Sequence, residues 1–172
     1  GPDLTYWMSG GFGGRGGMRN TPTYADLMVA TDGNGMLRSY LASEENWNVL
    51  KTLESRNLLV PVVGNFAGPK ALKAVGQYIA DRGATVSAFY VSNVEQYLFM
   101  DLLFDRFAAN VASLPVSDAS VFIRSVSSRY GYNGPRTWSD GRATALDPIK
   151  GFVVDYKAGR LTNYSAVNAR SR

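Results

Sequence analysis

The sequence predicts an α/β fold: a mostly parallel sheet with flanking helices, forming a Rossmann-like half. Two short apolar runs, Leu58–Val63 and Thr85–Val91, enclose a segment whose apolar residues recur with the helical period. Pro69 stands at the start of that segment and Gly83 just after it, at the positions where helices favour these residues. A crossover helix of this length returns the chain to the same sheet edge, so we expect the two runs to be parallel strands.

Two helices are predicted before this unit. Thr21 can cap a helix over residues 22–30, which a turn at residues 32–35 then ends. Ser43 can cap a second helix over residues 44–56, where apolar residues three apart predict a core-facing stripe. The stripe consists of Trp47, Leu50 and Leu53.

A long helix is predicted over Asn93–Asn110, with Ser92 and Glu95 as a capping box. Its apolar residues form two groups, which predicts two partners. One group is an arc from Tyr97 to Val111 that includes Met100. The other group is Leu98, Phe99, Leu102 and Leu103. We expect the second group to be covered by a second copy of the chain or by a missing N-terminal half, with the chain's own C-terminal third as the alternative.

The C-terminal third is predicted to be irregular and rich in Gly, Arg and aromatic residues. A third strand is expected over Ser120–Val126, and a fourth over Gly151–Tyr156. Between them, residues 127–142 interleave Arg and aromatic side chains, which could stack on bases or sugars or fold back onto the domain. The interleaved residues are Arg129, Tyr130, Tyr132, Arg136, Trp138 and Arg142. Without a module signature we favour the fold-back and disfavour nucleic acid.

We predict three regions in the chain: a flexible Gly-rich segment over residues 1–20, one α/β domain over 21–156, and a polar basic tail over 157–172 in which Arg170 and Arg172 fray. Residues 9–17 contain six glycines but lack the strand and helix of a nucleotide-binding loop. No apolar run is long enough to span a bilayer. The compartment stays open, with the cytoplasm slightly favoured over secretion.

The composition limits the chemistry that the 172 residues can perform. There is no Cys and no His, which excludes disulfides, thiolate metal sites and the common catalytic triads. Any catalysis must use Asp, Glu, Lys, Tyr or Ser. The turn at residues 32–35 resembles a calcium loop superficially but lacks its distal ligands, so we expect no metal site. The net charge of +4 arises in the last third, and a solvated basic end is the simpler explanation.

Four stretches carry a resemblance to a known family: Pro22–Met28, Ser39–Glu45, Pro61–Ala71 and Ser87–Leu98. Over residues 4–124 the chain resembles an uncharacterised bacterial family whose longer members are similar to SAM-dependent methyltransferase-like α/β proteins. The resemblance implies that nucleoside binding belongs to an N-terminal half that this chain lacks. It therefore implies no cofactor for this chain alone, and SAM only together with that half. Asn65 stands where many members have Asp.

Two functions follow as expectations. In open α/β sheets ligands bind beyond the carboxyl ends of the strands, which makes the first expectation a ligand-binding or catalytic half-domain for a small molecule. Its candidate residues are Asn65, Lys70, Ser92, Asn93, Glu95 and Arg124. Each also has a structural interpretation: Ser92 and Glu95 as a cap, Arg124 as the partner of an internal carboxylate. The alternative is a non-enzymatic assembly or binding module that uses the apolar helix and aromatic loops and could lie outside the cytoplasm.

Overall fold

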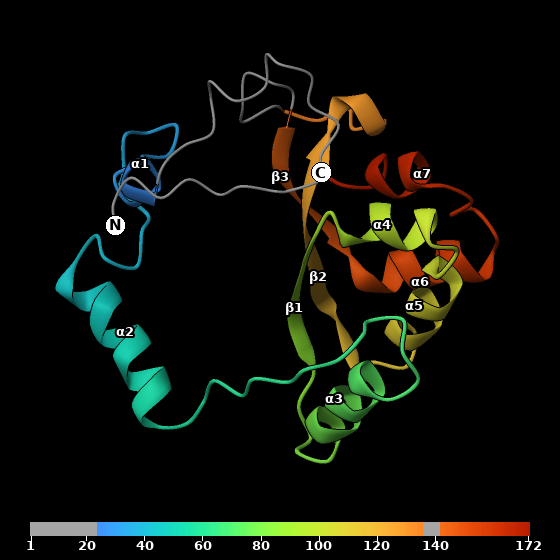
Figure 1. Cartoon of the computed structure of the whole chain (residues 1–172), viewed down its shortest axis with the longest axis horizontal. Helices are drawn as coiled ribbons and strands as arrows, with labels where there is room; N and C mark the ends of the chain where they lie inside the picture. The colour runs from blue at the N-terminus through green and yellow to red at the C-terminus, as the bar shows by residue number, and fades with distance from the viewer. Residues whose placement is uncertain (1–23, 136–141) are drawn as a thin grey trace. The chain divides into compact units, whose positions relative to one another are not determined.

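The structure is a computed structural model that describes residues 24–135 and 142–172 (Figure 1). The chain divides into two compact units, residues 1–61 and 62–172. The Gly-rich stretch of residues 9–17, the proposed cap Thr21, and Arg136 and Trp138 lie outside the described residues.

The described part of unit 1, residues 24–61, contains two helices, α1 (Tyr24–Met28) and α2 (Glu44–Ser55). The predicted turn between them is confirmed, since the Asp32 carboxylate accepts the N–H groups of Asn34 and Met36. Ser43 caps α2 as predicted, its Oγ accepting the Asn46 N–H at 3.1 Å. No described residue of this unit is buried, so the expected apolar stripe of α2 is not a core within the unit.

Unit 2 is built on a three-stranded mixed sheet in the order β1 (Val86–Ser92), β2 (Val116–Ser127), β3 (Arg142–Pro148). β1 and β2 are parallel, whereas β3 runs antiparallel to β2. The predicted α/β class is confirmed, and so is the placement of the two strands at 85–91 and 120–126 in one sheet. Only one pair is parallel.

Helices cover one face of this sheet. They are α3 (Ala71–Ala80), α4 (Val94–Met100), α5 (Phe104–Val111), α6 (Ile149–Lys157) and α7 (Tyr164–Asn168), with the short 3-10 helix η2 (Ser128–Tyr130) after β2. Figure 1 shows α4, α5, α6 and α7 together on that side. Aromatic rings fill the space beneath them. The ring centroid of Phe152 in α6 lies 5.1 Å from that of Phe122 in β2 and 6.4 Å from that of Phe107 in α5.

The predicted strand Leu58–Val63 is wrong. This segment has no secondary structure, its side chains are exposed, and the parallel partner of β1 is β2. Pro61 in the middle of the run lacks the N–H that a ladder would use, which lowers its strand propensity below what its apolar character suggests. The helix predicted between the two runs is confirmed as α3, with Gly83 after it at φ 64°, but without a strand at residues 58–63 it is not a crossover between two strands.

The predicted long helix over residues 93–110 is also wrong, because it is two helices. Leu102 adopts φ 57°, and its N–H and that of Leu103 bond to the carbonyls of Phe99 and Leu98. This is the pattern that ends a helix, normally with Gly at the left-handed position. A leucine there gives no signal in the sequence.

The break changes which side chains face the core. Leu98, expected in the outer group, is buried in one cluster with Leu161 and Val167, whereas Tyr97 and Met100 of the expected core arc are exposed. The chain's own C-terminal region thus contributes to covering this helix, as in the alternative left open above.

The predicted strand Gly151–Tyr156 is wrong, because these residues form α6, in which Phe152 is buried and Val154 is exposed. The expected polar tail is folded, and Leu161, Tyr164 and Val167 are buried. The expected fraying at the end does not occur either. Arg172 exchanges two backbone hydrogen bonds with Leu146 of β3, both at 2.8 Å.

Candidate functional site

A buried charge cluster lies where β1 ends and α4 begins. Arg124 of β2 donates to both oxygens of Glu95, at 2.7 and 2.8 Å, and to Asp147 of β3 at 2.6 Å. All three side chains are at most 1% exposed. Side chains alternate between the two faces along each strand, which brings Arg124 and Asp147 to the same side as α4. The residues that face the helices are 120, 122, 124 and 126 of β2 and 143, 145 and 147 of β3.

The cluster extends toward the surface through a second arginine. Arg170 donates hydrogen bonds to both carboxylate oxygens of Asp147, at 3.0 and 3.2 Å. It also forms an ion pair with Asp155, which in turn accepts a hydrogen bond from Arg160. This chain of ion pairs ties β3 to α6 and to the C-terminus. Arg170, expected to fray, is held in it.

The electrostatics of Arg124 favour its charged form. Burial by itself lowers the pKa of Arg124, but the facing carboxylates of Glu95 and Asp147 raise it above its usual value. Its guanidinium also lies 4.3 Å from the ring centroid of Phe122. All three of its nitrogens donate to carboxylates, which leaves this group committed to internal partners.

The structure brings four of the six predicted site residues together, though in different roles. Arg124 is the partner of an internal carboxylate, as in its structural interpretation, and it pairs in register with Ser92. The predicted capping box is wrong: Asn93 is the N-cap of α4 without a side-chain cap bond, and Glu95 turns inward to Arg124. Ser92 has φ 53°, a left-handed conformation between strand and helix.

Asn65 and Lys70 lie on the turn before α3, and the contacts of that turn run to α5. The Asn65 side chain accepts the Ala67 N–H at 2.8 Å, and Asn110 of α5 donates to the carbonyls of Phe66 and Gly68. Lys70 is exposed at the start of α3. Neither belongs to the charge cluster.

Sequence reasoning missed Asp147 and Arg170. The alternation of residues 142–148 could have placed Asp147 on the buried face, but no strand is predicted there, in a C-terminal third expected to be irregular. It also missed Tyr164, whose pKa burial raises. The Asn168 amide opposes that shift from beside the Tyr164 hydroxyl, yet its own atoms make no hydrogen bond of good geometry.

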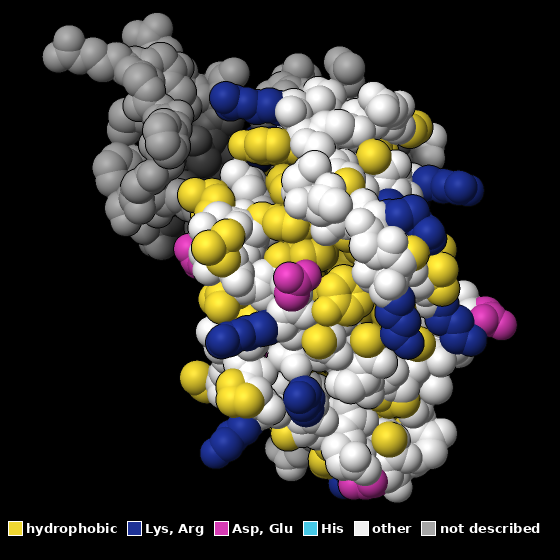
Figure 2. Space-filling model, turned by 90° about the vertical axis from the view of Figure 1, so that its right-hand side faces the viewer, with side chains coloured by type: hydrophobic (Ala, Val, Ile, Leu, Met, Phe, Trp, Pro, Cys, Tyr) yellow, Lys and Arg dark blue, Asp and Glu magenta, His cyan; other side chains and the backbone are white. Residues whose placement is uncertain are grey.

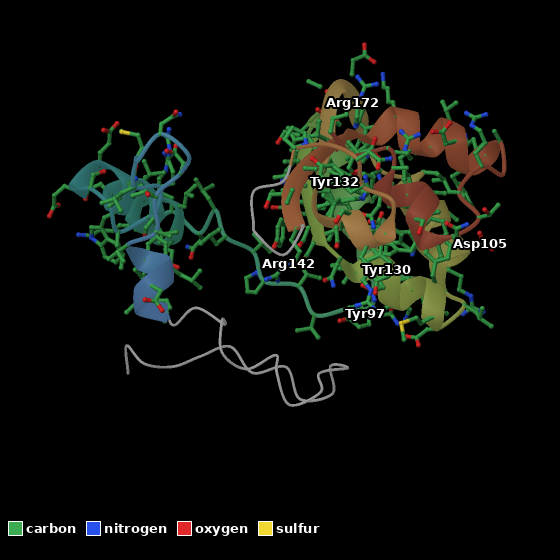
Figure 3. All side chains as sticks on the ribbon, turned by 90° about the horizontal axis from the view of Figure 1, so that it is seen from above. Tyr97, Asp105, Tyr130, Tyr132, Arg142 and Arg172 are labelled. Carbon is green, nitrogen blue, oxygen red and sulfur yellow. The ribbon has the colours of Figure 1, made fainter. Side chains whose placement is uncertain are left out.

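The described part of the Arg- and aromatic-rich loop folds back onto the domain. The Tyr130 hydroxyl lies 3.2 Å from Gln96 Nε2, and its ring packs on Tyr164. Tyr132 is buried and donates to the Pro135 carbonyl. Figure 3 labels Tyr130 and Tyr132 on unit 2. These two tyrosines are not free to stack on a ligand.

Open grooves lie away from the charge cluster. One of about 350 Å³ is lined by α3 and residues 113–115, and another of about 410 Å³ by residues of α5 and α6, including Asp105 and Tyr156. None of the six predicted residues lines either groove. Among the described residues, no three carboxylates gather as a metal site would need, and no helix is long and apolar enough to cross a membrane.

On the opposite face of the sheet, which none of the described helices of unit 2 covers (Figure 1), six apolar residues lie beside the polar Ser125, Thr144 and Arg142. Tyr90, Ile123 and Leu146 are directly paired across the three strands, and Tyr90 is 65% and Leu146 49% exposed. Ala88, Val121 and Pro148 form the adjacent row. We call these six residues the open face. None is charged, whereas Lys and Arg are scattered over the helix side (Figure 2).

The two edges of the sheet also differ. The outer edge of β3 is partly occupied, because Arg172 pairs with Leu146 there. Within the described residues no further strand pairs with β1, so β1 is an edge strand; its residues Val86–Tyr90 are half-buried or exposed, and Val91 is buried. β1 has neither Pro nor a charged residue, the features that usually protect an edge. The open face and this edge form one continuous apolar surface, and this surface is the candidate site.

A family described as "Domain of unknown function (DUF7790)" matches residues 19–166. No curated protein matches the chain. The match agrees with the expected membership of an uncharacterised family, and the resemblance to methyltransferases stays a prediction.

Proposed function

The chain belongs to the DUF7790 family, whose description assigns no function, and we propose that it is a non-enzymatic assembly module that contacts another protein through the open face. One observation carries this proposal: apolar side chains of all three strands meet in a row, at Tyr90, Ile123 and Leu146, on the side of the sheet that no described helix of unit 2 covers. An antiparallel or mixed sheet with one solvated face normally alternates apolar inward and polar outward residues. This sheet carries apolar residues on both faces.

The energetics favour a partner. Moving a side chain of this kind out of water stabilises by about 1.5–3 kcal/mol, and the open face contains several such side chains in contact range. An exposed apolar patch that is contiguous and free of charge is typical of protein–protein contact sites.

A second candidate is the ligand-binding half-domain. Ser92 and Asn93 support it, because they are half-buried polar residues at the carboxyl end of a strand in a parallel pair, where α/β proteins bind ligands. The charge cluster beneath them favours a structural role, because its charged side chains are buried and paired with one another. We therefore rank this candidate second.

The test is sedimentation of the full chain over a concentration series, with Leu146→Lys as the probe. Lysine on the open face should abolish association, because its ammonium would have to lose its water in the contact. Val154→Lys is the matched control: Val154 is also exposed and apolar, but it lies on α6 on the helix side. Association that the two variants weaken equally, or a wild type that stays monomeric throughout, would contradict the proposal.

A further inference from the structure

We propose that two copies of this chain join through the free edges of β1, antiparallel to each other, so that their sheets become one continuous sheet. This inference rests on the proposed function and names its partner, a second copy. A strand edge presents a row of backbone N–H and C=O groups that another strand can pair with. β1 ends the described sheet, and its residues Val86–Tyr90 are half-buried or exposed, whereas Val91 is buried.

The sequence of β1 suits pairing with itself. A twofold axis sets the same residues of both copies against each other, so any charge would meet its like. β1 has none. Antiparallel ladders need no crossover and are slightly more stable per residue than parallel ones. The exposed segment Leu58–Val63 is a poorer occupant, because Pro61 cannot donate to a ladder.

The geometry of β1 predicts the register. Its pairing with β2 is regular from Ala88 to Tyr90 and shifts on both sides of that stretch. We therefore place the twofold axis at Phe89. Ala88 of one copy then lies opposite Tyr90 of the other on the open face, and the two Phe89 side chains meet on the helix side.

The pairing would also join the two open faces. Tyr90 sits at the sheet edge in the row that continues to Ile123 and Leu146, so the row would run on across the axis into the second copy. One apolar surface would replace two smaller ones.

Disulfide trapping tests the register, since the chain has no native cysteine. Ala88→Cys and Tyr90→Cys are made separately, one with a mass tag, and mixed under mild oxidation. Opposed residues in an antiparallel pair have Cβ atoms roughly 4.5–5.5 Å apart, within disulfide reach after small adjustments, whereas residues two positions off are farther apart. The mixed dimer should exceed either homodimer several-fold. Thr144→Cys on β3 is the control and should cross-link little.

Three outcomes would overturn the inference. They are equal yields for mixed dimer and homodimers, a preferred disulfide from Tyr90→Cys to Val62→Cys, and cross-linking no greater than at Thr144→Cys. If Leu146→Lys still abolishes association while β1 shows no preferred register, the assembly function stands and the edge pairing fails. Circular dichroism of each variant establishes that it is folded.

Discussion

At the residue scale, the buried Arg124 holds α4 against the sheet of unit 2. Arg124 links α4, β2 and β3 through Glu95 and Asp147, and these carboxylates are as buried as the arginine itself. A buried ion pair of this kind adds little net stability over apolar residues of similar shape, but removing one partner leaves a charge buried without compensation. The cluster thus makes the packing of α4 on the sheet depend on three residues together.

The substitution Arg124→Met should lower the free energy of unfolding by about 3–5 kcal/mol, because Glu95 and Asp147 would lose the cation between them. Urea denaturation of unit 2 measures this. Lys150→Met is the control: Lys150 pairs with Asp118 at 2.7 Å on the surface, and such pairs contribute roughly 0–1 kcal/mol. Similar losses for both variants would contradict the structural role of the cluster.

Tyr164 should make the fold sensitive to high pH. Burial raises its pKa above the ordinary 10.0, so the unfolded chain ionises first as the pH rises. Its contribution to stability is therefore complete below pH 10 and is lost as the pH rises through the folded pKa. The free energy of unfolding of Tyr164→Phe should fall less steeply above pH 10 than that of the wild type. Parallel pH profiles for the two proteins would contradict this.

At the element scale, the sequence predicted those elements whose ends carry local signals. Ser43 and Gly83 define α2 and α3 because each satisfies backbone groups at a helix end. The break at Leu102 has no such signal, and α6 was taken for a strand because four of its six residues at 151–156 are apolar or aromatic. In the site, Glu95 and Arg124 were identified, but their pairing depends on tertiary packing that no local pattern reports.

Leu102→Gly should stabilise unit 2. A left-handed leucine costs roughly 1–2 kcal/mol of backbone strain, and Leu102, at 92% exposure, gives up little packing when truncated. After the entropy that glycine adds to the unfolded chain, we expect a gain of about 0.5–1 kcal/mol in denaturation. Tyr97→Gly, exposed and in the interior of α4, should instead lose about 1 kcal/mol. A loss at both positions would show that Leu102 is not strained.

At the scale of the whole molecule, the features that sequence could not predict are the ones that define the proposed function. In the described part of unit 2 all helices lie on one side of the mixed sheet, and the strand expected beside β1 is not in the sheet. Periodicity cannot reveal which edge of a sheet stays open, because that depends on the order of strands distant in sequence.

This chain alone should not bind SAM tightly. Its Gly-rich stretch at residues 9–17 lacks the preceding strand and following helix of a nucleoside-binding turn in the sequence. Titration calorimetry with SAM checks this, and a dissociation constant in the micromolar range or below would contradict it and favour the ligand-binding candidate.

Hydrogen–deuterium exchange of β1 at increasing protein concentration tests the central claim most directly. If the open face and edge are an assembly surface, the amides of Val86–Tyr90 should become more protected as concentration rises, because a second copy covers backbone groups at the sheet edge, whereas Val91 is already buried. The amides of α6 on the helix side should not change. Protection of β1 that is the same at every concentration, with a wild type that stays monomeric, would contradict the account.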